Sequence, residues 1–365
     1  MLTDTAPFVG IQYCGLAWAM AHPLLQSQLV KYYGDRRTVE DQYETSTQWM
    51  DLVSAHNPES IVRDGLGDHE SLEPTPVPSI VTPLYFQSAG ILARLAGLLG
   101  LKSDEDRFDA LADAVREAYL QKVLSSSPDR FDGQSQAALA TALALGILSE
   151  DVQDRAFRAL SAKTCATPEK SEPALTTGIF GTKFLLEALS SGGRADVAYD
   201  VVKRKSFPGW DYMLERGATT LWEHWDFSDN TFSHNHPMFG SVSEWFYRWL
   251  AGIQPAPGAF GFDRILLRPQ PVGDLKWAAA SVRTVRGEIK SKWRIEAGNF
   301  LCDVEIPANT RAGVYVPSQD SASVLEGGRP AATSDGVRFV KQIGGCSVYE
   351  IGSGVYSFSV PLGSR

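Results

Sequence analysis

Two neighbouring stretches carry most of the chemistry of this chain: Gly217-Ala-Thr-Thr-Leu-Trp-Glu-His-Trp225 and Ser233-His-Asn-His-Pro-Met-Phe-Gly-Ser-Val-Ser-Glu-Trp245. Three of the six histidines fall within thirteen positions here, and Glu223 lies between Trp222 and Trp225. Because apolar neighbours disfavour a charged carboxylate, we expect the pKa of Glu223 to be raised towards a value useful for proton transfer. The alternative is a tryptophan-rich seam between helices with a buried, paired glutamate.

The indoles of Trp222 and Trp225 also suit a carbohydrate. Flat indole rings stack on the apolar C–H face of a sugar, while His234 and His236 could hydrogen-bond its hydroxyls. For His234 an equally good interpretation is that it fixes the loop. The stretch therefore predicts a sugar site with a titratable glutamate.

Several segments resemble the bacterial α-L-rhamnosidase family of glycoside hydrolases. They are residues 217–225, 235–247 and 250–253, with further matches at 32–37, 65–71, 176–182 and 266–269. The resemblance implies inverting hydrolysis of terminal α-L-rhamnosides, for which two carboxyl groups act on opposite sides of the bond. It assigns the general base to Glu223 and a contact with a rhamnose hydroxyl to His236.

One departure from the family pattern concerns the general acid. In the family this is a glutamate in a short acidic motif upstream of the first matching segment, and nothing in this sequence corresponds to it. We therefore expect the base half of the site without the acid half, as in a fragment or a chain completed by another. The alternative is a non-catalytic homologue that binds rhamnose-containing glycans. Glu244 rivals Glu223 as a base, but its position favours a surface or helix-end salt bridge.

A second polar cluster comprises Asp68, His69 and Glu70, between glycines that permit a tight backbone path. The resemblance places this loop on the active-site face, where many family members carry an aromatic residue in place of His69. Asp68 and His69 are candidates for substrate binding, and an Asp-capped turn is the alternative. Trp210 is a candidate stacking residue because Pro208-Gly209 predicts a loop there.

The pattern from about residue 10 to 253 is helical. It predicts helices at 13–33, 37–54, 80–100, 104–124, 134–147, 150–163, 175–191, 194–204 and 238–252. The last would place five apolar side chains on one face: Phe239, Val242, Phe246, Trp249 and Ile253. The resemblance implies an (α/α)6 toroid, which needs twelve helices, so we expect an incomplete toroid that lacks about three helices at its N-terminal end. Its exposed apolar faces would favour a homodimer.

From residue 255 the pattern changes to alternating strands. Phe300, Cys302, Val304 and Ile306 would share one face, and further strands are expected at 292–295, 313–316 and 355–360. The predicted fold is therefore mainly α with a β tail: an α-helical catalytic-type domain over 1–254 and a small antiparallel β-sandwich over 255–365.

Composition excludes several other classes. The 365 residues are 44% apolar and carry a net charge of −9, which argues against nucleic acid and anionic membranes as partners. No apolar run reaches the roughly 18 residues of a spanning helix. The N-terminus shows no signal peptide, which favours the cytoplasm.

No metal or cofactor site is expected. His234 and His236 lack the helical i, i+4 zinc spacing, and no Gly-rich phosphate loop follows a strand. Calcium bound by loop aspartates stays open. Cys302 and Cys346 could be neighbours in the β tail, although buried thiols are favoured over a disulfide.

Overall fold

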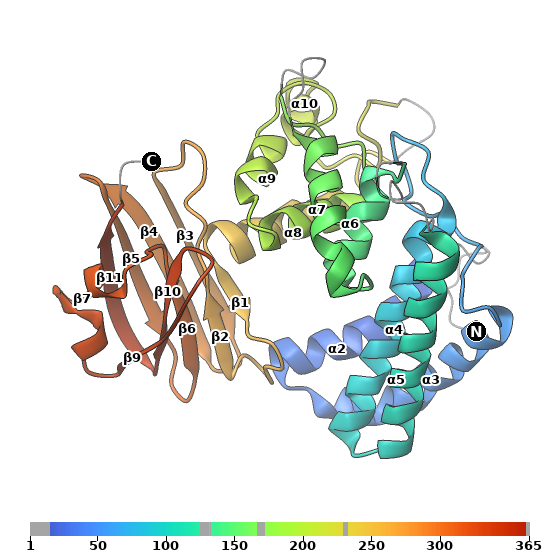
Figure 1. The fold of residues 1–365 in the computed structure, drawn as a ribbon, viewed down its shortest axis with the longest axis horizontal. Helices are drawn as coiled ribbons and strands as arrows, with labels where there is room; N and C mark the ends of the chain where they lie inside the picture. Colours follow the sequence, from blue (N-terminus) through green and yellow to red (C-terminus); the bar gives the residue numbers. More distant parts are fainter. Residues whose placement is uncertain (1–14, 125–130, 132, 166–171, 229–232, 363–365) are drawn as a thin grey trace. The chain divides into compact units, whose positions relative to one another are not determined.

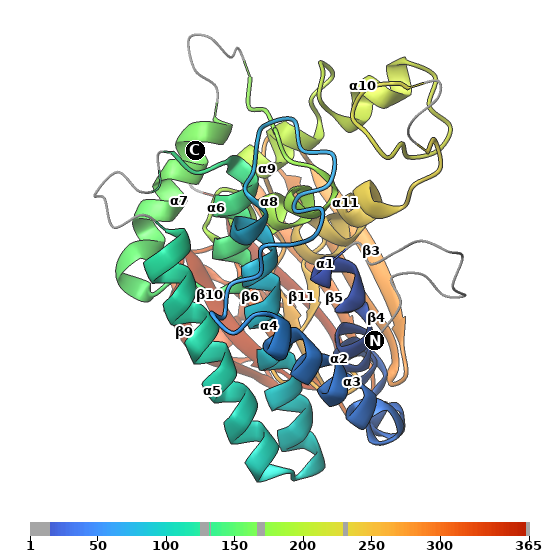
Figure 2. The same ribbon diagram turned by 90° about the vertical axis from the view of Figure 1, so that its right-hand side faces the viewer.

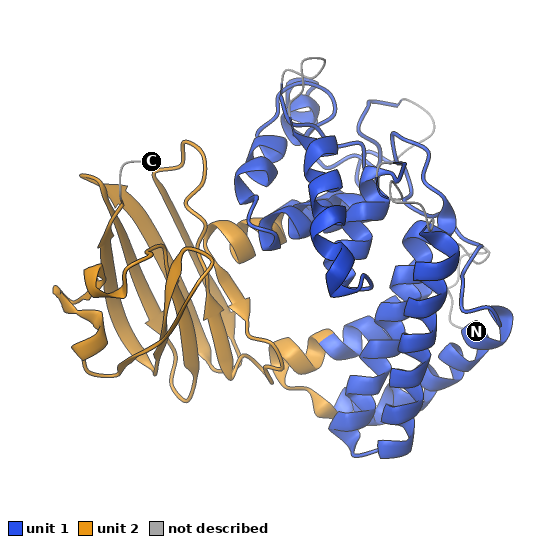
Figure 3. Cartoon of the chain, in the orientation of Figure 1, with its two compact units in different colours: residues 1–27, 37–242 blue, residues 28–36, 243–365 orange. Residues whose placement is uncertain are grey.

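The computed structural model describes residues 15–124, 131, 133–165, 172–228 and 233–362. The chain divides into two compact units, residues 1–27 with 37–242, and residues 28–36 with 243–365 (Figure 3). The second unit thus includes a helical segment from early in the chain, which the predicted division at 254/255 leaves in the first domain.

The first unit is built from helices (Figure 1). These are α1 (Leu16–Ala19), α2 (Ala21–Tyr33), α3 (Arg36–His56), α4 (Val77–Leu99), α5 (Lys102–Ala118), η1 (Tyr119–Val123), α6 (Gln136–Leu145), α7 (Glu150–Thr164), α8 (Ile179–Ser191), α9 (Ala195–Val202) and α10 (Trp210–Glu215), with the ends of α2 and α3 that meet at residues 28–36 belonging to the second unit. The eight helices predicted before residue 205 are present within a few residues at their ends, and α10 was not predicted.

Helical hairpins explain how these elements pack. Gly100 adopts the left-handed conformation that ends α4, and α5 then runs back along it (Figure 2). At α6, the hydroxyl of Ser135 accepts from the N–H of Ala138, and Gly146 ends the helix in the same way as Gly100. The charged helix α5 buries only one stripe, which includes Phe108 and Val115.

The helix predicted at 238–252 is interrupted. It consists of the 3-10 turn η2 (Met238–Gly240), the short helix α11 (Ser241–Trp245) and the π-helical turn η3 (Phe246–Leu250). Phe239, Val242 and Trp249 are buried as expected, but Phe246 is 41% exposed. A π turn holds more residues than an α turn and so rotates the apolar face. Ile253 is buried in a strand rather than a helix.

The second unit contains two sheets. The strands are β1 (Ile253–Pro255), β2 (Arg264–Leu267), β3 (Trp277–Thr284), β4 (Gly287–Glu296), β5 (Asn299–Ile306), β6 (Arg311–Val316), β7 (Leu325–Glu326), β8 (Arg329–Pro330), β9 (Val337–Ile343), β10 (Cys346–Ile351) and β11 (Gly354–Pro361). One sheet has the order β1-β2-β6-β10-β9 and the other β3-β4-β5-β11-β7-β8. The predicted sandwich is antiparallel except that β2 pairs with β6 in parallel.

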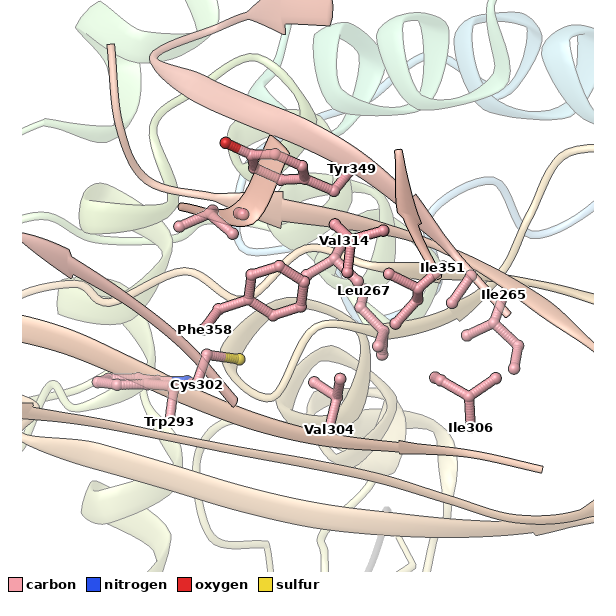
Figure 4. Close-up of a cluster of buried hydrophobic side chains, with 14 of the residues drawn as sticks. Ile265, Leu267, Trp293, Cys302, Val304, Ile306, Val314, Tyr349, Ile351 and Phe358 are labelled. Carbon is pink, nitrogen blue, oxygen red and sulfur yellow. The ribbon is translucent and has the colours of Figure 1, made fainter. Parts of the chain in front are cut away.

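The inner faces of the two sheets form the core of this unit. Figure 4 shows Ile265, Leu267 and Tyr349 of one sheet facing Trp293 and Val304 of the other. In β5, residues alternate between buried and half-buried, so the predicted inward face is confirmed. Cys302 and Cys346 are free thiols, as is Cys165. In the described part of the chain, no helix is long and apolar enough to cross a membrane.

Candidate functional site

Glu223 lies on a short two-stranded pairing of loop residues. Its backbone N–H donates to the carbonyl of Ser233 at 2.9 Å, and the N–H of His236 donates to the carbonyl of Leu221 at 2.9 Å. The N–H of Ser233 in turn donates to Oε2 of Glu223 at 2.9 Å. The two stretches singled out in the sequence therefore meet at Glu223 and bring His236 near it.

The second polar cluster reaches the same glutamate. Nε2 of His69 lies 3.1 Å from Oε1 of Glu223, across 154 positions of sequence. Nδ1 of the same imidazole lies 3.3 Å from Oε1 of Glu70, and Nε2 of His224 lies 4.0 Å from Oε2 of Glu70. His69 thus stands between two carboxylates.

Asp68 anchors this loop to α8. Its carboxylate accepts from the N–H groups of Gly178 at 2.7 Å, Gly181 at 2.8 Å and Phe180 at 3.2 Å. These are the unpaired donors of a helix N-terminus, so Asp68 acts as a cap supplied from a distant loop. The N–H of Ile179 also donates to the carbonyl of His69 at 2.8 Å.

This placement corrects the substrate-binding role expected of Asp68. The residue is only 5% exposed, and both its oxygens are engaged by α8. Burial raises the pKa of Asp68 to about 6, against the three backbone N–H groups that favour its charged form. These hydrogen bonds hold the loop to α8, which is nearer to the alternative of a capped turn.

The pKa expected for Glu223 is also wrong in direction. Burial does oppose ionisation, but the N–H of Ser233, the hydrogen bond from His69 and the nearby His236 together hold the pKa of Glu223 below its usual range. The side chain keeps 19% of its surface exposed. A carboxylate that is ionised at neutral pH and reachable by water suits a general base rather than a general acid.

The expectation that Trp222 and Trp225 offer exposed indole faces is wrong. Trp225 is fully buried, stacks on Phe239 with ring centroids 3.9 Å apart, and donates from Nε1 to the carbonyl of Thr177 at 2.8 Å. Trp222 is 4% exposed. Both indoles are therefore buried beneath the loop, which agrees with the alternative interpretation of a tryptophan-rich seam.

The comparisons with known proteins bear on this arrangement. A family model described as the bacterial alpha-L-rhamnosidase 6 hairpin glycosidase domain matches residues 1–250. This chain belongs to the bacterial α-L-rhamnosidase family. The family's C-terminal domain model matches residues 252–329.

Named rhamnosidases are similar over most of the chain. An α-L-rhamnosidase of Streptomyces avermitilis is 32% identical across 98% of this chain, and one of Formosa agariphila is 28% identical across 80%. The chain covers 34% and 33% of those two proteins, so it spans about a third of the curated relatives that it matches.

Solved rhamnosidase structures share the fold. The Streptomyces avermitilis enzyme complexed with L-rhamnose gives a TM-score of 0.88 at 30% identity, over 98% of this chain and 34% of that one. The enzyme of Dictyoglumus thermophilum also gives 0.88 at 30% identity, over 97% of this chain and 41% of that one. The predicted family and fold class, a helical toroid-type domain followed by a β-sandwich, are confirmed.

Within this rhamnosidase-type domain, the side chains of Trp210 and His234 contact backbone carbonyl groups of the protein. Trp210 is the first residue of α10, not of a loop, and its Nε1 donates to the carbonyl of Phe239 at 3.1 Å. Nε2 of His234 lies 2.6 Å from the carbonyl oxygen of Ser228, and its ring packs at 4.7 Å from that of Phe227. These contacts favour the interpretation of His234 as a residue that fixes the loop.

His236 is the remaining predicted contact residue of the rhamnosidase match. It is half-buried, and its Nδ1 has no hydrogen-bond partner within the described residues. The Nδ1 atom is itself buried, so a contact between His236 and a ligand hydroxyl stays a prediction. Glu244, the rival base, forms an ion pair with Arg248 at 3.3 Å, as expected. In the described ranges, no cluster of three or more His, Cys, Asp or Glu side chains could hold a metal ion.

The sequence interpretation named Glu70 only as a member of the second polar cluster, without a role, and missed Glu73. Glu70, with a φ of 62°, adopts the left-handed region that non-glycine residues rarely enter, and its Oε1 lies 3.3 Å from Nδ1 of His69. Glu73 accepts from the N–H of Gln136 and from the hydroxyl of Thr176, each at 2.8 Å, and so caps α6. The acidic run in 68–73 is the signal that could have indicated both roles.

Proposed function

We propose that this chain carries the water-activating part of an α-L-rhamnosidase site, with Glu223 as general base in inverting hydrolysis of terminal α-L-rhamnosides. The observation that carries the proposal is the state of Glu223, which is ionised, partly exposed and held by two hydrogen-bond donors on a loop of the rhamnosidase family. The substrate class follows from the relatives, which are named α-L-rhamnosidases.

Glu223 keeps hydrogen-bonding capacity for a water molecule. Oε1 accepts from His69 and Oε2 from Ser233, but a carboxylate offers about four lone-pair positions, so two remain. A water held there would give its proton to Glu223 as its oxygen bonds to the anomeric carbon. The glycosidic C–O bond then breaks, and the departing oxygen takes a proton from an acid about 6.5–9.5 Å from the base. His236 would donate to or accept from a rhamnose hydroxyl.

A chromogenic aryl α-L-rhamnoside tests this proposal. Its activated leaving group needs little help from an acid, so the base can be assayed on its own. Glu223→Gln should lower kcat by about 10²–10⁴-fold, the usual contribution of a positioned base. Glu244→Gln is the matched control, since it makes the same chemical change at a carboxylate paired with Arg248, and it should leave turnover unchanged.

Other outcomes separate the alternatives. Turnover that survives in Glu223→Gln would contradict the assignment of the base. A folded wild-type chain that binds L-rhamnose without turning over the substrate would support the non-catalytic homologue instead. The homodimer remains a prediction, and light scattering over a concentration series tests it.

A further inference from the structure

We propose that His69, backed by Glu70, is a positioning residue that holds the carboxylate of Glu223 in the orientation and charge state needed to activate water. This inference rests on the proposed function of Glu223 and adds to it a second residue that acts through Glu223.

The first support is the placement of the imidazole between two carboxylates. Nε2 lies 3.1 Å from Glu223 and Nδ1 lies 3.3 Å from Glu70. A neutral imidazole donates through one nitrogen only, whereas the protonated ring donates through both. Because carboxylate oxygens only accept, the contact with Glu223 requires a proton on Nε2, and a protonated ring would donate to both carboxylates.

The second support is that the backbone of the loop fixes the direction of His69. Asp68 is held by three N–H groups of α8, and the carbonyl of His69 accepts from Ile179. Gly178 allows this contact, because a Cβ at that position would lie 2.0 Å from the carbonyl oxygen of His69. The loop can therefore shift little without losing several hydrogen bonds.

The third support is the surroundings of the three side chains. Their exposed fractions are 23% for His69, 14% for Glu70 and 19% for Glu223, so water screens the contacts only in part. The other titratable groups that face these three side chains are Asp68, His224 and His236. With Glu223 bound from one side by His69 and from the other by Ser233, its carboxylate has a single favoured orientation.

The test compares three variants with the wild-type chain on the aryl α-L-rhamnoside. His69→Leu should lower kcat by about ten- to a hundredfold, the worth of a hydrogen bond to a charged group, with KM little changed. The acid limb of the kcat/KM profile should move to higher pH, because the donor that favours ionised Glu223 is gone. His69→Gln should restore part of the rate, because its amide N–H replaces the Nε2 donor. Glu70→Gln should shift the acid limb in the same direction, by less.

The matched control is His56→Leu, the same change at an exposed histidine whose Nδ1 lies 2.7 Å from the carbonyl oxygen of Leu52. It should alter neither kcat nor the pH profile. If His69→Leu keeps the wild-type kcat and acid limb while Glu223→Gln is inactive, the positioning role is overturned although the proposed function stands.

A second measurement does not depend on turnover. A ¹³C NMR titration of the Glu223 carboxyl should give a higher midpoint in His69→Leu than in the wild-type chain. If the chain lacks activity, this rise still supports the positioning role and only the proposed function fails. An unchanged midpoint in His69→Leu overturns the inference in either case.

Discussion

Asp68 and Glu223 belong to two loops of the helical unit, and their carboxylates differ in burial and in the direction of their pKa shifts. Asp68 is 5% exposed and both its oxygens are engaged by the N-terminus of α8. Glu223 accepts two hydrogen bonds and remains partly exposed. Burial dominates at Asp68 and raises its pKa to about 6, whereas donors dominate at Glu223 and lower its pKa.

The contrast shows how this domain divides its acidic residues. The loop over 65–73 uses two of its three carboxylates on helix N-termini, where Asp68 caps α8 and Glu73 caps α6. That fixed frame brings His69 to Glu223, whose carboxylate keeps lone pairs that these contacts do not occupy. Both oxygens of Asp68 are engaged by backbone N–H groups of the protein, whereas Glu223 keeps lone pairs that water can reach, so Glu223 is the better candidate for a general base.

The largest expected effect on stability comes from filling the space between the loop over 65–73 and the N-terminus of α8. Gly178→Ala would place a Cβ 2.0 Å from the carbonyl oxygen of His69 and 2.7 Å from the backbone nitrogen of Ser71. Since backbone atoms cannot move aside as a flexible side chain does, we expect the free energy of unfolding to fall by about 3 kcal/mol or more. Urea denaturation measures this.

The control for Gly178→Ala is Gly313→Ala in β6, where an added Cβ meets nothing within 4 Å. Its free energy of unfolding should change by less than about 1 kcal/mol. Equal stability of the Gly178→Ala variant and the wild-type chain would show that the loop over 65–73 does not dock on α8 as described.

Asp68→Asn should have the next largest effect and a particular pH dependence. Asparagine keeps one acceptor oxygen for three N–H groups, so we expect a loss of about 2 kcal/mol at pH 7. Because the folded pKa of about 6 lies above the ordinary 3.8, the stabilisation from Asp68 is complete below pH 3.8 and is lost as pH rises through 6. The difference in the free energy of unfolding between wild type and variant should therefore increase on acidification, by up to about 3 kcal/mol.

Denaturation at several pH values between 5 and 8 tests this sign, with Asp64→Asn as the control at an exposed position of the same segment. A gap that instead narrows on acidification would mean that the three backbone N–H groups outweigh burial at Asp68. The pKa of Asp68 would then be lowered, as that of Glu223 is, and the two carboxylates would differ in burial alone.

The fold was largely predictable because its signals are local. Alternation in 300–306 gave the inward face of β5, and the helical period gave eight helices before residue 205. The exceptions have local causes that the period does not show. The π turn at 246–250 rotates the helix face, and the parallel pairing of β2 with β6 depends on the path of the chain between them.

The site was predictable only in part, because its decisive contacts join distant segments. The family match indicated Glu223 and His236. It could not show that Trp225 is buried, because the contacts that bury it are with Thr177 and Phe239. Nor could it show that the carboxylate of Asp68 accepts hydrogen bonds from α8, more than a hundred positions later. A tryptophan or a carboxylate has the same composition signal in a core as in a cleft, and only packing distinguishes them.

The smallest expected effect is on the stability of Glu223→Gln, and it should have the opposite pH dependence to Asp68→Asn. The folded pKa of Glu223 lies below the ordinary 4.5, so its stabilisation is present above pH 4.5 and is lost as pH falls through the folded pKa. At pH 7 the variant should be less stable by about 1 kcal/mol, the net worth of the hydrogen bonds weakened on neutralisation, and this gap should close on acidification. Glu244→Gln, at a 39% exposed carboxylate that forms an ion pair with Arg248, should lower the free energy of unfolding by less. If Glu223→Gln is instead more stable than the wild-type chain at pH 7, then the donors from His69 and Ser233 do not compensate for the burial of the charge. Glu223 would then lower the stability of the chain, as a residue retained for function can, and the contrast with Asp68 would not be one of folding stability.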